Sequence, residues 1–294
     1  MTKPAGKSWV AAAAIVVFLL AGCAAKTANV NIWGDPETGL NLTYRIPSDY
    51  ALTYDSTSDS SEVSEVMGQT IEVLTDGTSK YSFRTVGETD GNLQLEVTID
   101  GLSMDINSPQ GNVIPDMKGL IGKSFKMTLS PLGEELDASE AAALEYELIA
   151  GQTRNLQSGF QTIFPDLPDR AVKIGDSWPS YASIEEESDT NSMKIEMEME
   201  NTLVGFETVD GLECAKVESK ITGTVTGEGT QQGMNLTTSG NLKGTDTWYF
   251  AYAEGYLVKI ASEVEVDASV EVSGAADMTI PTTRVMNMEM ILVK

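Results

Sequence analysis

Hydrophobic and polar residues alternate one by one along most of the chain after residue 41. This period of two is typical of β-strands that bury one face, because successive side chains point to opposite sides of a sheet. The clearest runs cover residues 42–54, 93–99, 125–129, 193–199, 257–272 and 286–292. The pattern predicts a mainly β protein with antiparallel strands.

Asp-Gly pairs separate several of these runs and indicate where strands turn. They stand at positions 76–77, 90–91, 100–101 and 210–211. Glycine adopts the positive φ angles of two-residue hairpin turns without steric cost, so Asp-Gly between alternating runs is a strong hairpin signal. We expect a turn at each pair.

The hydrophobic period changes between residues 139 and 164. Five apolar side chains are spaced for one stripe of an α-helix: Leu144, Leu148, Leu156, Phe160 and Phe164. Ser139 is a suitable N-cap, and Pro165 disfavours helix in the residue before it. The spacing predicts a helix over this segment, with Gly151 as its weak point.

The β-rich segments on either side of the predicted helix resemble each other. Each has an Asp-Gly pair, an aromatic residue 34 or 37 positions later (Phe125 and Trp248), and a glycine 8 or 7 positions after that. Matching order at similar spacing suggests an internal duplication. We therefore predict two related antiparallel curved-sheet or half-barrel units, over residues 41–137 and 167–294, joined by a helical connector over 138–166.

The first 22 residues have the pattern of a secretory signal peptide. Lys3 and Lys7 precede an apolar run of 12 residues, which is shorter than the roughly 20 that a membrane-spanning helix needs. Leu20-Ala21-Gly22-Cys23 resembles a bacterial lipobox, which implies cleavage before Cys23 and lipidation of that cysteine, for example with palmitate. The alternative is an ordinary cleaved signal with a chance cysteine.

Residues 23–40 are small and polar, as expected of a lipidated tether between the membrane and the folded body. In proteobacterial lipoproteins an aspartate after the lipidated cysteine favours retention in the inner membrane. Because Ala24 stands there, the resemblance favours the outer membrane of the cell envelope.

The amino-acid composition excludes several kinds of partner and catalytic site. The formal net charge is −25, so nucleic acid, which requires a basic patch, is not an expected partner. Histidine is absent, which excludes Ser-His and Cys-His nucleophile pairs and zinc sites with histidine ligands. The densest acidic run, residues 185–189, lacks the spacing and turn glycine of a calcium loop. We expect no cofactor, no metal and no enzymatic activity.

Methionine is concentrated on single faces of two predicted strands. Met193, Met197 and Met199 share one face, and Met286, Met288 and Met290 share another. Methionine is flexible and polarizable, and adaptable apolar binding surfaces use it often. The two stripes, with Trp178 and Trp248 packed nearby, are therefore candidate contacts for an apolar ligand. Ordinary core packing is the alternative interpretation.

The stretch Phe164-Pro165-Asp166-Leu167-Pro168, followed by Gly175-Asp176-Ser177-Trp178 downstream of the lipobox, resembles a family of uncharacterised bacterial lipoproteins. That family has no established catalytic residues, so the resemblance implies none. At the level of architecture the chain is similar to lipoprotein-carrier proteins and mycobacterial lipid-binding lipoproteins. This second likeness implies a curved antiparallel sheet around an apolar cavity.

The leading functional hypothesis is a membrane-anchored, non-enzymatic envelope lipoprotein that binds a hydrophobic or lipid-like ligand. Two alternatives remain open. One is a structural or assembly lipoprotein that binds another envelope protein. The other is a carboxylate-dependent hydrolase, which would need two acidic side chains in one cleft.

The lipobox generates a direct prediction. Cys23→Ser removes the thiol that would carry the lipid, so the variant should incorporate no labelled palmitate and should leave the membrane fraction. Membrane retention of the wild type without incorporated palmitate would contradict the assignment.

Overall fold

The computed structural model describes residues 34–149, 152–187, 191–231, 233–274 and 277–293. All of these residues belong to one compact unit, Ile32–Lys294. Among them there is no helix that is long and apolar enough to cross a membrane.

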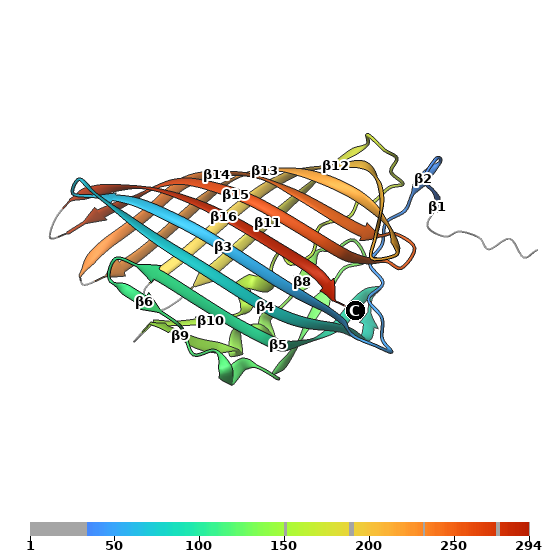
Figure 1. The fold of residues 1–294 in the computed structure, drawn as a ribbon, viewed down its shortest axis with the longest axis horizontal. Helices are drawn as coiled ribbons and strands as arrows, with labels where there is room; N and C mark the ends of the chain where they lie inside the picture. Colours follow the sequence, from blue (N-terminus) through green and yellow to red (C-terminus); the bar gives the residue numbers. More distant parts are fainter. Residues whose placement is uncertain (1–33, 150–151, 188–190, 232, 275–276, 294) are drawn as a thin grey trace, which may run out of the picture. The chain divides into compact units, whose positions relative to one another are not determined.

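In the described part of the chain, twelve strands form one sheet in which every neighbouring pair is antiparallel (Figure 1). The prediction of a mainly β, antiparallel protein is therefore confirmed. The strands are β3 (Leu52–Val66), β4 (Gln69–Thr89), β5 (Asn92–Ser108), β6 (Gly111–Val113), β7 (Ser124–Leu129), β8 (Glu135–Asp137), β11 (Ser177–Glu187), β12 (Asn191–Val209), β13 (Leu212–Gln231), β14 (Met234–Ala251), β15 (Tyr256–Ser273) and β16 (Met278–Val293).

The strand order is β11-β12-β13-β14-β15-β16-β3-β4-β5-β7-β8, and β6 pairs with β5. Two small two-stranded sheets lie outside this order, β1 (Gly34–Asp35) with β2 (Gly39–Leu40) and β9 (Glu145–Ile149) with β10 (Gln152–Asn155). Three short 3-10 helices complete the described elements: η1 (Lys118–Leu120), η2 (Ser139–Ala143) and η3 (Gln157–Phe160).

Two of the four Asp-Gly pairs form the predicted hairpins. Asp90-Gly91 joins β4 to β5, and Asp210-Gly211 joins β12 to β13. In both pairs the aspartate has φ near 50° and the glycine has φ of 82°. Positive φ at both central residues is the signature of the type I′ turn, which matches the twist of the flanking strands.

The turns predicted at the other two pairs are wrong, because both pairs lie inside strands. Gly77 continues β4 opposite Ser58, and a Cβ on Gly77 would come 2.6 Å from the Ser58 hydroxyl oxygen. Gly101 lies in β5 beside a register shift between β4 and β5. At these positions glycine accommodates close packing and a bulge rather than a reversal of the chain.

The prediction of two joined β units also needs correction, because the ladder between β16 and β3 unites both halves in one sheet. The C-terminal strand pairs with the first long strand from Thr282↔Ser64 to Val293↔Thr53. The sheet therefore passes from one predicted unit to the other through backbone hydrogen bonds, and the described residues between the units contain no α-helix.

The helix predicted over residues 139–164 is not found. The described residues of this segment form η2, the β9–β10 hairpin and η3. Its aromatic side chains pack against the sheet: Phe160 packs on Tyr81 and Phe125, and Phe164 packs on Phe83. Tertiary contacts thus override the helical spacing, which is interrupted by Gln152 where a continuous stripe would need an apolar residue.

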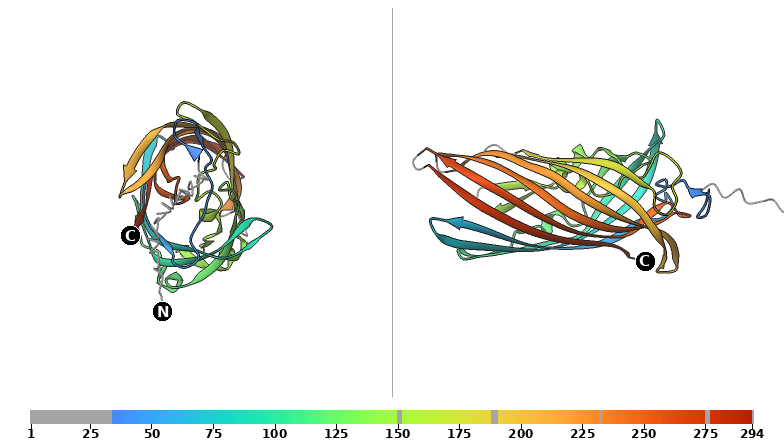
Figure 2. Two further views of the ribbon diagram at one scale, coloured as in Figure 1. Left: turned by 90° about the vertical axis from the view of Figure 1, so that its right-hand side faces the viewer. Right: turned by 90° about the horizontal axis from the view of Figure 1, so that it is seen from above.

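The sheet is strongly curled, as the end view in Figure 2 shows, while β11 and β8 at the two ends of the strand order are not hydrogen-bonded to each other. Glycines on the concave face permit this curvature. A Cβ on Gly223 would lie 2.2 Å from the Glu196 carbonyl oxygen, and one on Gly244 would lie 2.5 Å from that of Glu263. Only a residue without a side chain allows the strands to approach so closely on the inner side.

One end of the curled sheet is filled by a continuous hydrophobic core. Extended residues 40–46 enter it and bury Leu40, Leu42, Tyr44 and Ile46. The Phe164-to-Trp178 motif closes this core, since Phe164 packs on Tyr44, whose hydroxyl donates to the Pro165 carbonyl oxygen at 2.9 Å. The indole of Trp178 donates to the Asp166 carbonyl oxygen at 3.0 Å. In the structure this motif therefore has a packing role.

Close packing at Gly223 predicts that Gly223→Ala destabilises the protein by about 2 kcal/mol, the usual scale for forcing an extra methyl group into a filled space. The control is Gly205→Ala in the neighbouring strand β12, where a Cβ would meet no atom within 4 Å. Urea unfolding should separate the two variants, and equal stability would contradict the proposed origin of the curvature.

Candidate ligand-binding cavity

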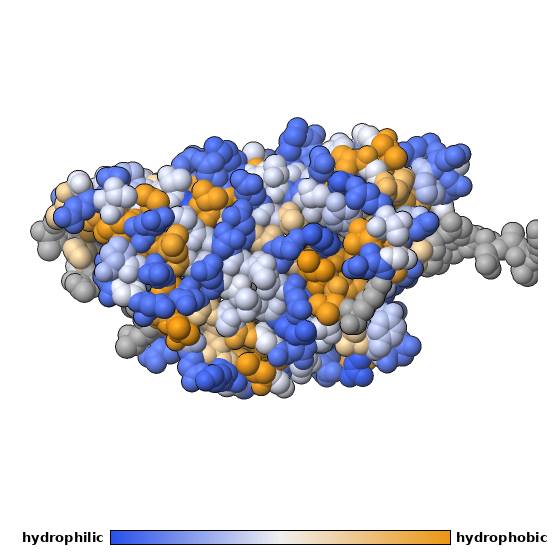
Figure 3. Space-filling model, viewed as in Figure 1, coloured by the Kyte–Doolittle hydropathy of each residue, from blue (hydrophilic) through white to orange (hydrophobic). Residues whose placement is uncertain are grey.

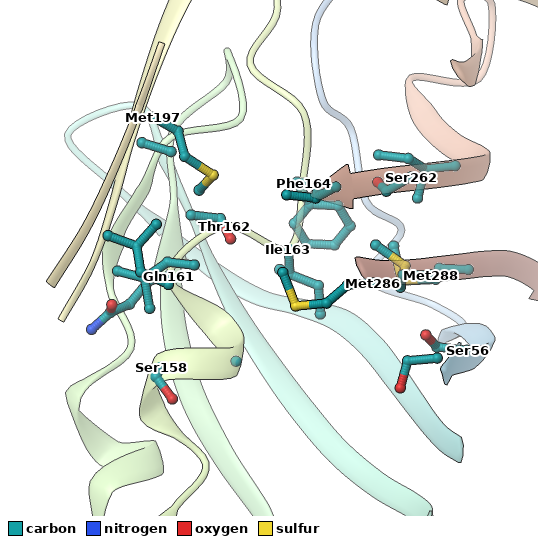
Figure 4. Close-up of a pocket in the computed structure, with 18 of the residues that line it drawn as sticks. Ser56, Ser158, Gln161, Thr162, Ile163, Phe164, Met197, Ser262, Met286 and Met288 are labelled. Atoms are coloured by element: carbon teal, nitrogen blue, oxygen red, sulfur yellow. The ribbon is translucent and has the colours of Figure 1, made fainter. Parts of the chain in front are cut away.

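The concave face of the sheet encloses a cavity of about 770 Å³. Strands β3–β5 and β11–β16 supply most of its wall. The rest of the wall comes from residues between 155 and 166, some of which are labelled in Figure 4, and from Met117, Glu134, Glu135 and Tyr146.

Both methionine stripes contribute to this cavity. Met197 and Met199 of β12 line it, as do Met286, Met288 and Met290 of β16. Three strands separate β12 from β16 in the sheet, so the curvature of β13–β15 brings the stripes to one space. Figure 4 shows Met197 and Met286 reaching the cavity from different strands.

Met193 differs from the other predicted site residues on its stripe. It is 38% exposed and lies outside the main cavity. It lines a second cavity of about 680 Å³, whose wall includes Glu185, Glu187 and Glu228. The two cavities share Asn155, Ser158 and Gln161, so they adjoin each other.

The two candidate tryptophans lie at different depths. Trp248 is 1% exposed and lines the cavity, whereas Trp178 packs edge-on against Trp248 with ring centroids 6.1 Å apart. Trp178 is not among the lining residues. Trp178 therefore packs beside the lining residue Trp248, and its contact with a ligand stays a prediction.

The central wall of the cavity is an apolar surface on strands β12–β15. Three buried residues form its centre, with five partly buried side chains packed on them: Ile221, Val225 and Leu242, then Ile195, Met197, Met199, Val264 and Val266. The partly buried side chains leave apolar surface facing the cavity, which an apolar ligand could cover with a gain of roughly 25 cal/mol per Å².

A belt of polar residues crosses the floor of the cavity between this wall and the filled core. Asn201, Ser219, Asp246 and Ser262 are successive cross-strand neighbours on β12, β13, β14 and β15. We call these four residues the polar belt. Asn201 donates to Ser180 at 2.9 Å, Ser219 donates to Asn201 Oδ1 at 2.6 Å, and the Trp248 indole donates to Ser219 at 3.0 Å.

Of the residues that the structure describes, four with carboxyl groups line the cavity, and sequence reasoning missed all of them: Glu134, Glu135, Asp166 and Asp246. Burial raises the pKa of Glu135 to about 8, although a hydrogen bond from the Phe164 backbone amide at 2.7 Å opposes this. Burial also raises the pKa of Asp166 to about 6, assisted by the charge of Glu134. The pKa of Asp246 is raised to about 6 by burial, against a hydrogen bond from Ser262.

The described residues provide no evidence for a metal-binding site or for a nucleophilic cysteine. The described residues contain no group of acidic or cysteine side chains that could hold a metal ion. Cys214 is fully buried, and burial raises its pKa to about 11, so it lacks the thiolate character of a nucleophile.

No family model matches the chain, and no curated protein matches it. Among solved structures, Pseudomonas aeruginosa OccK2 (OpdF) has 8% identity and a TM-score of 0.26, covering 85% of this chain and 100% of its own. The beta domain of the Bordetella autotransporter BrkA has 10% identity and a TM-score of 0.24, covering 83% and 100%. TM-scores this low do not indicate a shared fold. The lipobox, the lipoprotein resemblance and the lipid anchor remain predictions.

The buried carboxyl groups predict a stability that falls as pH rises. Each raised pKa means that the folded state keeps a proton that the unfolded state has already released, so the stabilisation is lost as pH approaches the folded pKa. Between pH 6 and pH 8 the carboxyl of Glu135 should continue to titrate, lowering the free energy of unfolding by at most about 1.4 kcal/mol per pH unit.

Chemical denaturation across this range provides the measurement. Glu135→Gln keeps an oxygen for the Phe164 amide but cannot ionise, so its stability should change less with pH than that of the wild type. Glu88→Gln at the exposed end of β4 serves as the control and should keep the wild-type slope. A Glu135→Gln slope equal to that of the wild type would contradict the assignment.

Proposed function

We propose that this chain is an exported lipoprotein, anchored to the cell envelope through Cys23, whose folded body binds a hydrophobic or lipid-like ligand without catalysing a reaction. The supporting observation is that five of the six methionines singled out in the sequence line one cavity. The lipid on Cys23 would hold this cavity near a membrane, where apolar ligands are abundant.

The size and lining of the cavity fit this function. Its volume of about 770 Å³ lies within the roughly 300–1,000 Å³ typical of small-molecule sites. Methionine side chains adapt to irregular apolar shapes, whereas β-branched residues pack rigidly. A wall of methionines beside Ile221 and Leu242 therefore suits flexible chains better than one rigid ligand.

The outer surface supports a body that is exposed to water. Along β12 the residues Lys194, Glu196, Glu198 and Glu200 alternate with the inward stripe and belong to the opposite face of the sheet. Figure 3 shows hydrophilic residues interspersed among small hydrophobic patches on the visible side. The charged exterior and the apolar interior together favour a carrier or receptor for an apolar molecule.

Hydrolysis is a second candidate, favoured by the carboxyl groups Glu135 and Asp166 in the same cavity. Their charges interact, and both have raised pKa values, as expected of an acid and base pair. However, Glu135 already accepts a hydrogen bond from the Phe164 backbone, so holding residues 163–166 in place accounts for its burial. Release of product from a bound ester or glycoside would favour hydrolysis over binding alone.

The cavity predicts binding of an uncharged apolar dye. Nile red should fluoresce on binding to the full-length protein held in an amphipathic polymer. Met286→Gln should weaken the binding of the dye about tenfold, because it places a polar amide against the apolar dye. The matched control is Met193→Gln, which changes the same chemistry on a side chain outside the main cavity and should bind as the wild type does.

Two results would contradict the proposed function. One is a wild-type protein that neither binds the dye nor carries a lipid-sized adduct in native mass spectrometry after gentle purification. The other is an equal loss of dye affinity in Met193→Gln and Met286→Gln, which would mean that the dye binds elsewhere.

A further inference from the structure

We propose that the ligand is an amphiphile whose head group is an amine or a hydroxyl, and that this head binds Asp246 on the floor of the cavity while the apolar chain lies along the methionine wall. The inference rests on the proposed function and specifies the class of ligand. It also assigns to Asp246 a role in selecting that ligand.

The register of the sheet places Asp246 where the apolar wall begins. Asp246 pairs with Ser262 in the polar belt, and the next inward pair on the same two strands is Gly244 with Val264. Leu242 with Val266 follows. The apolar chain of a ligand whose head binds Asp246 would extend along β14 and β15, away from the filled core. It would pass first the pair Gly244 and Val264 and then the pair Leu242 and Val266, and none of these four residues is polar.

The methionines line both flanks of this path. Met286 is the β16 neighbour of Val264, and Met288 is the β16 neighbour of Ser262. On the other side, Met199 is the β12 neighbour of Ile221, which in turn pairs with Gly244.

Asp246 needs a hydrogen-bond donor that the described residues do not supply. Its Oδ1 is buried without a hydrogen-bond partner among them, while Ser262 donates to the carboxylate. Ser219, its neighbour on β13, already donates to Asn201 Oδ1 and accepts from Trp248. A buried acceptor without a donor lowers the stability of the folded protein, so a donor from the ligand would remove this penalty.

Rotation of the carboxylate makes this acceptor accessible from the cavity. Asp246 is one of the residues that line the cavity, and the terminal torsion of an aspartate is broad and roughly two-fold. Whichever oxygen accepts from Ser262, the other remains for a second donor. Primary amines and hydroxyl groups supply such donors, and an ammonium also supplies a compensating charge.

The charge of the lining excludes the commonest alternative head group, a free carboxylate. Four carboxyl groups line the cavity, and none of the lining residues among the described ones is a lysine or an arginine. An anionic head would therefore lose its hydration and meet four carboxyl groups without a positive charge to compensate. A fatty acid should enter this cavity poorly, although its chain suits the wall.

Another buried atom without a hydrogen-bond partner, Arg284 Nε, does not change this conclusion. Arg284 is absent from the cavity lining, and its Nη2 donates to Ser60 at 3.3 Å. Its cross-strand neighbour on β3 is Glu62, an acidic residue. Arg284 therefore does not belong to the surface that an anionic head group at Asp246 would meet.

Three ligands with the same chain test the head group: dodecylamine, dodecanol and dodecanoate. Each is titrated below its micelle concentration into the full-length protein at pH 7.5, and displacement of Nile red reports binding. Dodecylamine and dodecanol should displace the dye, whereas dodecanoate should bind at least tenfold more weakly than dodecylamine.

Asp246→Asn then isolates the carboxylate, because it keeps the shape of the side chain and removes its charge. It should weaken the binding of dodecylamine at least tenfold and that of dodecanol by no more than a few-fold, with an unchanged circular dichroism spectrum as evidence of an intact fold. The control is Glu263→Gln, which removes the same charge from an exposed residue on the neighbouring strand and should leave all affinities unchanged.

The outcomes separate this inference from the proposed function. If Nile red binds but the three head groups bind equally, or if Asp246→Asn and Glu263→Gln weaken dodecylamine equally, the role of Asp246 is wrong and the apolar cavity remains. Dodecanoate binding as tightly as dodecylamine would also overturn the inference. If neither the dye nor any of the three ligands binds, the proposed function fails as well.

Discussion

The ladder between β16 and β3 is the interaction on which the rest of the structure depends. It joins residues more than two hundred positions apart in the chain and makes one sheet out of two sets of consecutive hairpins. Backbone groups along these strands would otherwise form two open edges, which are liabilities for aggregation. The same ladder fixes the stripe of Met286, Met288 and Met290 opposite the serines of β3, so it also determines one wall of the cavity.

The curled sheet is filled at one end and hollow along the rest, and this difference follows from which segments enter it. Residues 40–46 and the Phe164 motif bury large aromatic side chains among the strands. The strands are longer than the part of the sheet that residues 40–46 and the Phe164 motif cover. On the inner face of β12–β15, several apolar side chains are therefore only partly buried. This incomplete packing leaves the cavity in which a ligand could bind.

The boundary between these two regions is polar. The polar belt satisfies most of its own hydrogen bonds, and the exception is the Asp246 carboxylate. Placing this group and Glu135 in a buried site costs stability, because burial penalises the charged form. Such costs are common at functional sites, where a ligand compensates for what the folded protein leaves unsatisfied.

Several features could be predicted from the sequence because they depend on neighbouring residues. Alternation identified the strands, and two Asp-Gly pairs identified type I′ turns, since the turn conformation depends on the residues within it. Alternation also placed the methionines of β12 and β16 on single faces. The same local reasoning was wrong at Gly77 and Gly101, because glycine also serves close packing and bulges, and a single sequence does not distinguish these uses.

The predicted helix over residues 139–164 shows where local pattern loses to tertiary structure. Its apolar residues are spaced like a helical stripe, but Phe160 and Phe164 are buried by contacts with aromatic residues of the sheet, and the described residues of the segment form short 3-10 helices and a hairpin instead. By itself, the sequence determined the β class, two of the turns and the composition of each strand face. The union of both halves in one sheet, the meeting of the methionines around a cavity and the burial of Glu135 and Asp246 were decided only by tertiary structure, because each depends on contacts between residues far apart in the chain.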